Sequence, residues 1–210
     1  ETLMLIAANW KMNLGKFEID QFTNFLQSNE FHDKLDVCIF PPSVYINYLN
    51  TRIECLPISI GAQNCYHEFS GAFTGEVSPT SLKDIGCKYV LVGHSERRVN
   101  NNESNLYVQK CTSAAIKSDL IPIICVGETL KDREAGTALD FIEKQLIESV
   151  PSYFENIFVA YEPIWSIGTG KIPSSSEIKE MHKHIKQVIS SKFNNSIKVI
   201  WRVSKSFQCI

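Results

Sequence analysis

No apolar run in the 210 residues approaches the roughly 20 residues that a membrane-spanning helix needs. The first residues, ETLMLIAANWKMN, lack the basic stretch and the small-residue cleavage site of a secretory signal peptide. Only ten glycines and eight prolines occur, too few for a fibrous or disordered chain. The formal net charge is −2, so no positive excess suggests nucleic acid or an anionic membrane as a partner. We therefore expect one globular domain without either partner.

The cysteines lack a pattern that would bind a metal or build a disulfide scaffold. Their number, seven, is odd, and none belongs to a C-x-x-C pair. Free thiols are favoured over disulfides, which predicts a reducing, cytoplasmic location. His182 and His184 lie two residues apart, and a helix would turn them to different sides. A metal shared by these two histidines is therefore not expected.

Seven short runs rich in Val, Ile and Leu recur along the chain. Each is apolar on both faces, as is typical of parallel strands buried between helices and a core. The predicted strands are 3–9, 36–40, 58–62, 89–93, 121–127, 157–162 and 197–201.

Stretches with the period of amphipathic helices lie between these strands. In one of them, Phe22, Phe25 and Leu26 form an apolar stripe that we expect to face the core. The alternation predicts an α/β fold with a parallel sheet, either a (β/α)8 barrel or a doubly wound open sheet. No Gly-rich phosphate loop follows a strand, which argues against a dinucleotide or P-loop site. The predicted helices are 18–29, 103–118, 137–150 and 175–193.

Polar residues with acid–base chemistry follow the predicted strands at their C-terminal ends. Asn9 and Lys11 follow the first strand. His94 and Glu96 follow the fourth, and Glu162 ends the sixth. Active sites of (β/α)8 barrels are assembled at these strand ends. Each residue alone has a structural alternative, such as a surface lysine or a buried histidine, but the acid–base groups together indicate an active site.

The stretch 163–171, PIWSIGTGK, combines a rigid start with a flexible end. Pro163 and Trp165 would anchor one end, and Gly168 and Gly170 would give backbone freedom to the other. Such a loop can close over a site, exclude water and supply amide donors. An ordinary turn that contains glycine is the alternative.

Six segments, in this order, resemble the triosephosphate isomerase family, over about residues 1–200. The resemblance implies a TIM (β/α)8-type barrel that interconverts dihydroxyacetone phosphate and D-glyceraldehyde 3-phosphate, in glycolysis and gluconeogenesis. It implies no metal and no organic cofactor. The segments are AANWKMN (7–13), GAQN (61–64), SGAFTGEVSP (70–79), LVGHSERR (91–98), ICVGETL (124–130) and AYEPIWSIGTGK (160–171).

The same resemblance implies roles for the catalytic residues. Glu162 matches the general base that moves a proton between adjacent carbons. His94 matches the neutral imidazole that polarises the carbonyl group. Lys11 matches the cation that attracts the phosphorylated substrate, and Glu96 matches the carboxylate near Lys11 and His94. A base on carbon and a donor on oxygen are what proton removal next to a carbonyl requires.

The resemblance also implies binding and partner contacts. Asn9 and Lys11 lie at the substrate oxygens, and residues 163–171 match a lid whose Gly168 amide contacts the phosphate. The segment 63–75 matches a long loop that docks into a second subunit. Thr74 matches the residue that reaches the partner's site, so a homodimer is expected.

The resemblance ends after Val199. The family has a Y-G-G-S motif there and then a further helix, strand and helix, whereas this sequence reads IWRVSKSFQCI. Ser204 falls at the serine of that motif, which implies substrate binding. Seven predicted strands imply one incomplete barrel domain, 1–210, truncated after the seventh strand, with an atypical tail at 201–210. Because late loops commonly form the phosphate site, the alternative is a catalytically impaired member or a gene-model artefact.

Overall fold

A computed structural model of the chain describes residues 4–29, 35–166 and 172–201. The chain divides into two compact units, each built of strands and helices. Strand β5 (Ile121–Val126) and helix α5 (Asn105–Lys117) have residues in both units. The first unit is Glu1–Val92 with Ser113–Pro122, and the second is Gly93–Thr112 with Ile123–Ile210.

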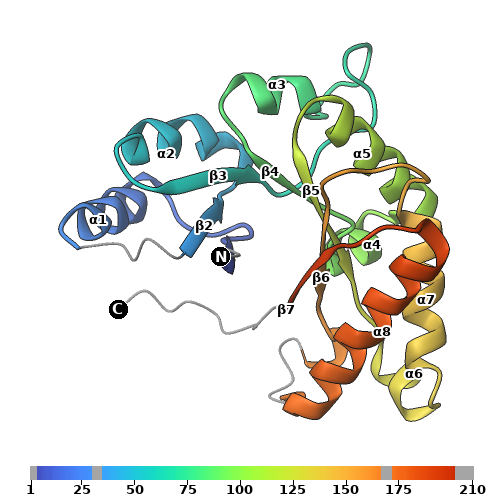
Figure 1. Ribbon diagram of the computed structural model, residues 1–210. Helices are drawn as coiled ribbons and strands as arrows, with labels where there is room; N and C mark the ends of the chain where they lie inside the picture. The colour runs from blue at the N-terminus through green and yellow to red at the C-terminus, as the bar shows by residue number, and fades with distance from the viewer. Residues whose placement is uncertain (1–3, 30–34, 167–171, 202–210) are drawn as a thin grey trace. The chain divides into compact units, whose positions relative to one another are not determined.

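The first unit contains four parallel strands whose order in the sheet is β1-β2-β3-β4. The register pairs Asn9 with Phe40 and Gly61 with Tyr89. Figure 1 shows α1, α2 and α3 on the same side of these strands. The elements are β1 (Met4–Asn9), α1 (Lys16–Gln27), β2 (Leu35–Phe40), η1 (Ser43–Tyr45), α2 (Ile46–Ile53), β3 (Ile58–Ala62), α3 (Pro79–Asp84) and β4 (Tyr89–Val92).

The second unit contains strands β5, β6 and β7 in that order, again in parallel. Helices α7 and α8 run side by side (Figure 1), and the imidazole of His184 contacts the carbonyl oxygen of Leu139 at 3.0 Å between them. The remaining elements are α4 (Ser95–Asn100), α6 (Leu130–Glu134), α7 (Ala138–Ser149), β6 (Phe158–Tyr161), η2 (Ile164–Ser166), α8 (Ser175–Phe193) and β7 (Lys198–Trp201).

The seven predicted strands are confirmed to within one residue at each described end, and the four predicted helices to within two. Their parallel pairing is confirmed in the pairs described above. The stripe expected to face the core in α1 is confirmed in part, because Phe22 and Leu26 are half-buried beside the buried Ile19 and Thr23. Phe25 is 63% exposed and does not belong to that face. Short helices such as α3 and α4 were not predicted from the sequence.

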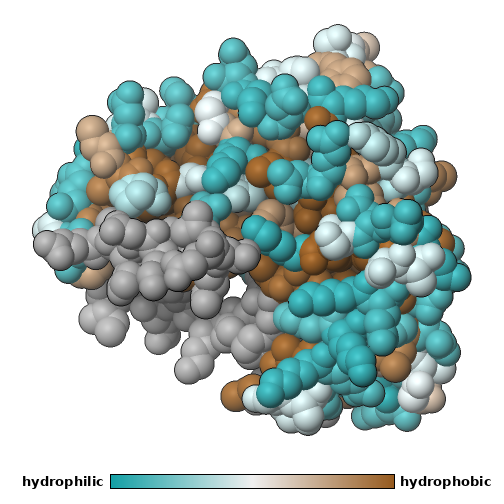
Figure 2. Space-filling model, in the orientation of Figure 1, coloured by the Kyte–Doolittle hydropathy of each residue, from teal (hydrophilic) through white to brown (hydrophobic). Residues whose placement is uncertain are grey.

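Helix α8 shows why the apolar periodicity of the sequence predicted a helix at the right place. It buries Met181, Ile185, Val188 and Ile189 along one stripe. In the view of Figure 2, hydrophilic side chains cover the part of the surface over α8. Among the described residues, no helix combines the length and the hydropathy needed to cross a membrane.

The C-terminal ends of β5 and β6 approach each other closely beyond the two strands. The Glu162 N–H donates to the carbonyl oxygen of Val126 at 2.9 Å, which continues the ladder. A Cβ atom at Gly127 would lie 1.9 Å from the Glu162 carbonyl oxygen, so position 127 accepts only glycine. The Gly127 N–H donates to the buried Gln145 side chain at 3.0 Å. The backbone of Glu162 is therefore fixed by its neighbours on β5.

Gly127→Ala is expected to destabilise the fold by about 3 kcal/mol, because the added methyl group must push the two strand ends apart. Urea unfolding monitored by circular dichroism measures the change. Gly15→Ala is the matched control, because its Cβ would meet only a flexible carboxylate oxygen of Glu18 at 3.2 Å. We expect that control to lose less than about 1 kcal/mol. An equal loss of unfolding free energy in the two variants would contradict the close approach of Gly127 to Glu162.

Candidate active site

His94 is held at the start of helix α4 by its own side chain. The preceding Gly93 has φ +65°, and a Cβ there would lie 2.7 Å from Val108, so the tight turn requires glycine. His94 is the N-cap of α4, and its Nδ1 accepts the Glu96 N–H at 3.2 Å. The His94 side chain is only 6% exposed. The hydrogen bond at Nδ1 fixes the orientation of the ring.

The Glu162 carboxylate faces this imidazole. Its Oε2 lies 3.3 Å from His94 Nε2, and its Oε1 accepts the Ser95 N–H at 2.9 Å. Glu162 is 2% exposed, so the pair is shielded from water. Because Nδ1 accepts a backbone N–H, the hydrogen-bond pattern assigns the proton of a neutral ring to Nε2. A carboxylate and an imidazole thus meet in one buried site.

Glu96 contributes to His94 through its backbone rather than its carboxylate. The carboxylate Oε2 is 3.7 Å from Nδ1, beyond hydrogen-bond distance, and the side chain is 46% exposed. The N–H of Glu96 is the group that contacts the ring closely. The structure thus brings three of the predicted site residues together in the second unit.

Asn9 and Lys11 form their own cluster in the first unit. The Asn9 side-chain oxygen accepts the Lys11 N–H at 2.8 Å. The Gln63 amide donates to the carbonyl oxygens of Lys11 at 2.7 Å and of Phe40 at 2.9 Å. Lys11 has φ +53°, a left-handed conformation that is strained in a residue with a side chain. The turn is therefore held in place by Asn9 and Gln63.

Thr74 lies on a loop that closes on itself and projects outward. The Tyr66 N–H donates to the Val77 carbonyl oxygen at 2.8 Å, which joins the two ends of the loop. Phe69 and Phe73 are 41% and 40% exposed, and Thr74 is exposed. The loop therefore offers aromatic surface to its surroundings.

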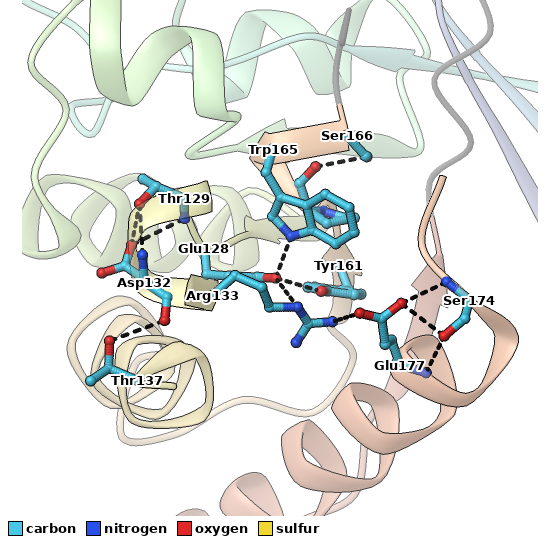
Figure 3. A network of polar contacts seen from close by, with 11 residues as sticks. Glu128, Thr129, Asp132, Arg133, Thr137, Tyr161, Trp165, Ser166, Ser174 and Glu177 are labelled. Atoms are coloured by element: carbon cyan, nitrogen blue, oxygen red, sulfur yellow. Dashed lines mark hydrogen bonds and ion pairs between the residues drawn. The ribbon is translucent and has the colours of Figure 1, made fainter. Parts of the chain in front are cut away.

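A buried polar network anchors the beginning of the segment 163–171. Glu128 is fully buried, and its Oε1 accepts the Tyr161 hydroxyl at 2.9 Å and the Trp165 indole N–H at 2.8 Å. Arg133 lies 3.7 Å from that oxygen and 3.2 Å from Glu177 on α8 (Figure 3). Burial and the Glu128 carboxylate raise the pKa of Tyr161, so its hydroxyl stays a donor. The network ties η2 to α6 and α8.

Two predicted site residues, Gly168 and Ser204, lie outside the described residues, as do 167–171 and the tail from 202 onward. Other residues near the site were missed. Gln63 lies in the GAQN segment, and Arg98 lies in GHSERR. Glu128 lies in ICVGETL, but its buried contacts could not be read from the sequence, because its partners Tyr161 and Trp165 follow 33 and 37 residues later. In the described part of the chain, no group of three His, Cys, Asp or Glu side chains is placed to hold a metal ion.

Comparison with known proteins identifies relatives of this chain. The family model of triosephosphate isomerase matches residues 4–203. The triosephosphate isomerase of Finegoldia magna is 40% identical over 198 residues, which cover 92% of this chain and 79% of the relative. That of Rhizobium meliloti is 39% identical over 193 residues, 90% of this chain and 75% of the relative. That of Alkaliphilus oremlandii is 40% identical over 197 residues, with shares of 92% and 79%.

The expected fold class is confirmed by the family match and by the parallel α/β arrangement, with seven strands among the described residues. The motifs that carry the resemblance also carry the His94–Glu162 contact. With a family model that spans nearly the whole chain and relatives about 40% identical over nine-tenths of it, this chain belongs to the triosephosphate isomerase family.

Proposed function

We propose that this chain interconverts dihydroxyacetone phosphate and D-glyceraldehyde 3-phosphate, with Glu162 as base and His94 as proton donor. The observation that carries the proposal is the 3.3 Å contact between the Glu162 carboxylate and the Nε2 atom of His94, in a buried site. This reaction moves a proton between adjacent carbons, so it needs a base near carbon and a donor near oxygen.

The reaction has two proton transfers at carbon. The Glu162 carboxylate removes a proton from the carbon next to the carbonyl group, and the electron pair of that C–H bond forms a C=C bond. Negative charge develops on the carbonyl oxygen, which the Nε2–H of His94 stabilises by hydrogen bonding. The proton of the neighbouring hydroxyl passes through Nε2 of His94 to the former carbonyl oxygen, so this hydroxyl becomes the new carbonyl group while the old carbonyl oxygen becomes a hydroxyl. Glu162 returns its proton to the other carbon. Burial of the pair keeps this proton from exchanging with water.

The geometry around the pair prepares both groups for this chemistry. The Ser95 N–H holds Oε1 of Glu162, which leaves Oε2 facing the imidazole. The Glu96 N–H on Nδ1 of His94 disfavours a proton there, so the ring acts as a neutral donor. A neutral donor suits an oxygen anion of similar basicity better than a fully charged imidazolium.

Lys11 and Asn9 are proposed to bind the phosphorylated substrate. The ammonium group supplies positive charge for a dianion, and the Asn9 side chain fixes the Lys11 backbone. The Gly168 amide and Ser204 are proposed as further phosphate contacts, on the family resemblance alone. Glu96 is proposed to act mainly through its N–H. The neutral His94 and the carboxylate make the chemistry independent of a cofactor in this proposal.

The proposal extends to assembly and location. The exposed Phe69 and Phe73 on the loop 63–75 support a homodimer in which Thr74 reaches the partner. Apolar surface of this kind is typical of subunit contacts. The six described cysteines are free thiols, in keeping with a cytoplasmic enzyme of glycolysis and gluconeogenesis.

Glu162→Gln and His94→Gln test the assigned roles. Loss of the base or the donor is expected to lower kcat by about 10²–10⁴-fold, with a much smaller change in KM. A coupled assay of glyceraldehyde 3-phosphate isomerisation measures both constants. Glu180→Gln, an exposed carboxylate on α8, is the control and should keep the parent kcat. Parent turnover in Glu162→Gln would refute the mechanism, and a folded parent chain without turnover would favour the impaired alternative.

Thr74→Arg tests the dimer. A bulky charge at the proposed contact is expected to convert dimers to monomers and to lower kcat at the same time. Sedimentation velocity at about 10 μM protein, above the dissociation constant of a dimer with micromolar or tighter affinity, measures the change. Ser152→Arg, also on an exposed residue, should stay dimeric. A parent chain that sediments as a monomer would exclude the proposed assembly.

A further inference from the structure

Arg98 is a half-buried arginine of α4 that the proposed mechanism does not use. It follows His94 by one helical turn, and its N–H donates to the His94 carbonyl oxygen at 3.0 Å. Its side chain turns back toward the strand ends instead of outward. Burial lowers its pKa, while Cys125, Glu103 and Glu162 nearby act in the opposite direction. A guanidinium remains charged under these conditions, so its hydrogen bonds persist across the working pH range.

The guanidinium joins four oxygens from separate segments. Its Nε donates to the Gly93 carbonyl at 2.7 Å, directly before His94. One terminal nitrogen donates to the Asn105 side chain at 2.6 Å. The other donates to the Cys125 carbonyl at 3.3 Å and to the Ser149 hydroxyl at 3.2 Å. The planar group thus connects the chain before His94 with β5, α5 and α7.

Close packing makes this connection rigid. Gly93 lies directly against the guanidinium, because a Cβ there would meet the Arg98 terminal nitrogen at 2.8 Å. The left-handed turn at Gly93 sets the direction in which His94 leaves the strand, and Arg98 holds the carbonyl of that turn. Asn105 is held in turn by donating to Glu148 at 2.7 Å. Every contact of the guanidinium therefore leads to an element with its own anchors.

Strand β5 is the common reference for both reactive groups. Arg98 attaches the turn before His94 to Cys125 of β5, and the Glu162 N–H attaches the end of β6 to Val126, the next residue of β5. The distance between the imidazole and the carboxylate therefore depends on two attachments to adjacent residues of one strand. Only the first of them is made by a side chain that can be changed without altering the backbone.

We propose that Arg98 is a positioning residue of this site, which fixes the turn before His94 to β5 and so sets the imidazole opposite Glu162. The proposal rests on the proposed isomerase function for its kinetic consequence. Arg98 touches neither substrate nor the reacting atoms in it. It acts through the Gly93 carbonyl and the strand.

Arg98→Ala removes the attachment and leaves a space of guanidinium shape. We expect kcat to fall about 10²-fold with KM within about threefold, because a small displacement of the donor affects mainly the chemical step. Guanidinium ion at about 50 mM should restore part of kcat, whereas the same concentration of KCl should not. Arg97→Lys is the matched control, because Arg97 lies in the same helix and pairs with Glu103 at 2.7 Å. It should keep the parent kcat.

A second readout does not depend on activity. In 15N-labelled protein, the Nε2–H resonance of His94 reports its contact with Glu162, and we expect Arg98→Ala to shift or broaden it. Parent kcat together with an unchanged His94 resonance in folded Arg98→Ala would overturn the proposal. An inactive parent chain would contradict the proposed function, and the resonance would still decide the role of Arg98.

A variant that keeps the guanidinium covers the case in which Arg98→Ala does not fold. The double substitution Asn105→Ala with Ser149→Ala removes two acceptors and leaves Arg98 in place. We expect a loss in kcat of about fivefold and a smaller shift of the same resonance, because the guanidinium is less firmly held. Parent behaviour of this double variant in both measurements would overturn the proposal.

Discussion

The carbonyl oxygen of Glu162 lies where a side chain at position 127 would have to be, 1.9 Å from an ideal Cβ atom. Only glycine allows the ends of β5 and β6 to come so close, and the rest of the site depends on this approach. The Glu162 N–H can then reach Val126, and the backbone of Glu162 becomes part of the sheet. The Gly127 N–H takes no part in the β5–β6 ladder, and it donates instead to the side-chain oxygen of Gln145.

His94 depends on a second glycine for a different reason. Gly93 supplies a left-handed turn, φ +65°, after which His94 is the N-cap and α4 begins at Ser95. The first backbone N–H groups of that helix lack partners within it, so they are free to bind side chains. One of them holds His94 Nδ1 and another holds Glu162 Oε1. A single helix start therefore sets the tautomer of His94 and the rotamer of Glu162.

The sequence predicted the strands, the longer helices and the residues at the strand ends, because apolar periodicity and strand-end position are local properties. In α1, apolar character alone could not exclude Phe25 from the core face, which includes the buried Ile19 and Thr23 and the half-buried Phe22. The role of Gln145 was also invisible, because its partner Gly127 lies 18 residues earlier and a buried glutamine has no distinctive local pattern.

Buried polar groups surround the His94–Glu162 pair, and each costs desolvation free energy that an apolar side chain would avoid. Gln145 and Arg98 offset this cost by hydrogen bonds to backbone groups at strand ends, where the ladder leaves oxygens and N–H groups unpaired. An apolar core at the same place would pack as well but would leave those groups unsatisfied. Hydrogen bonds also depend on distance and angle, so they constrain orientation more sharply than dispersion contacts do. The strand ends are therefore the part of the fold where polar burial gives a precise geometry as well as stability.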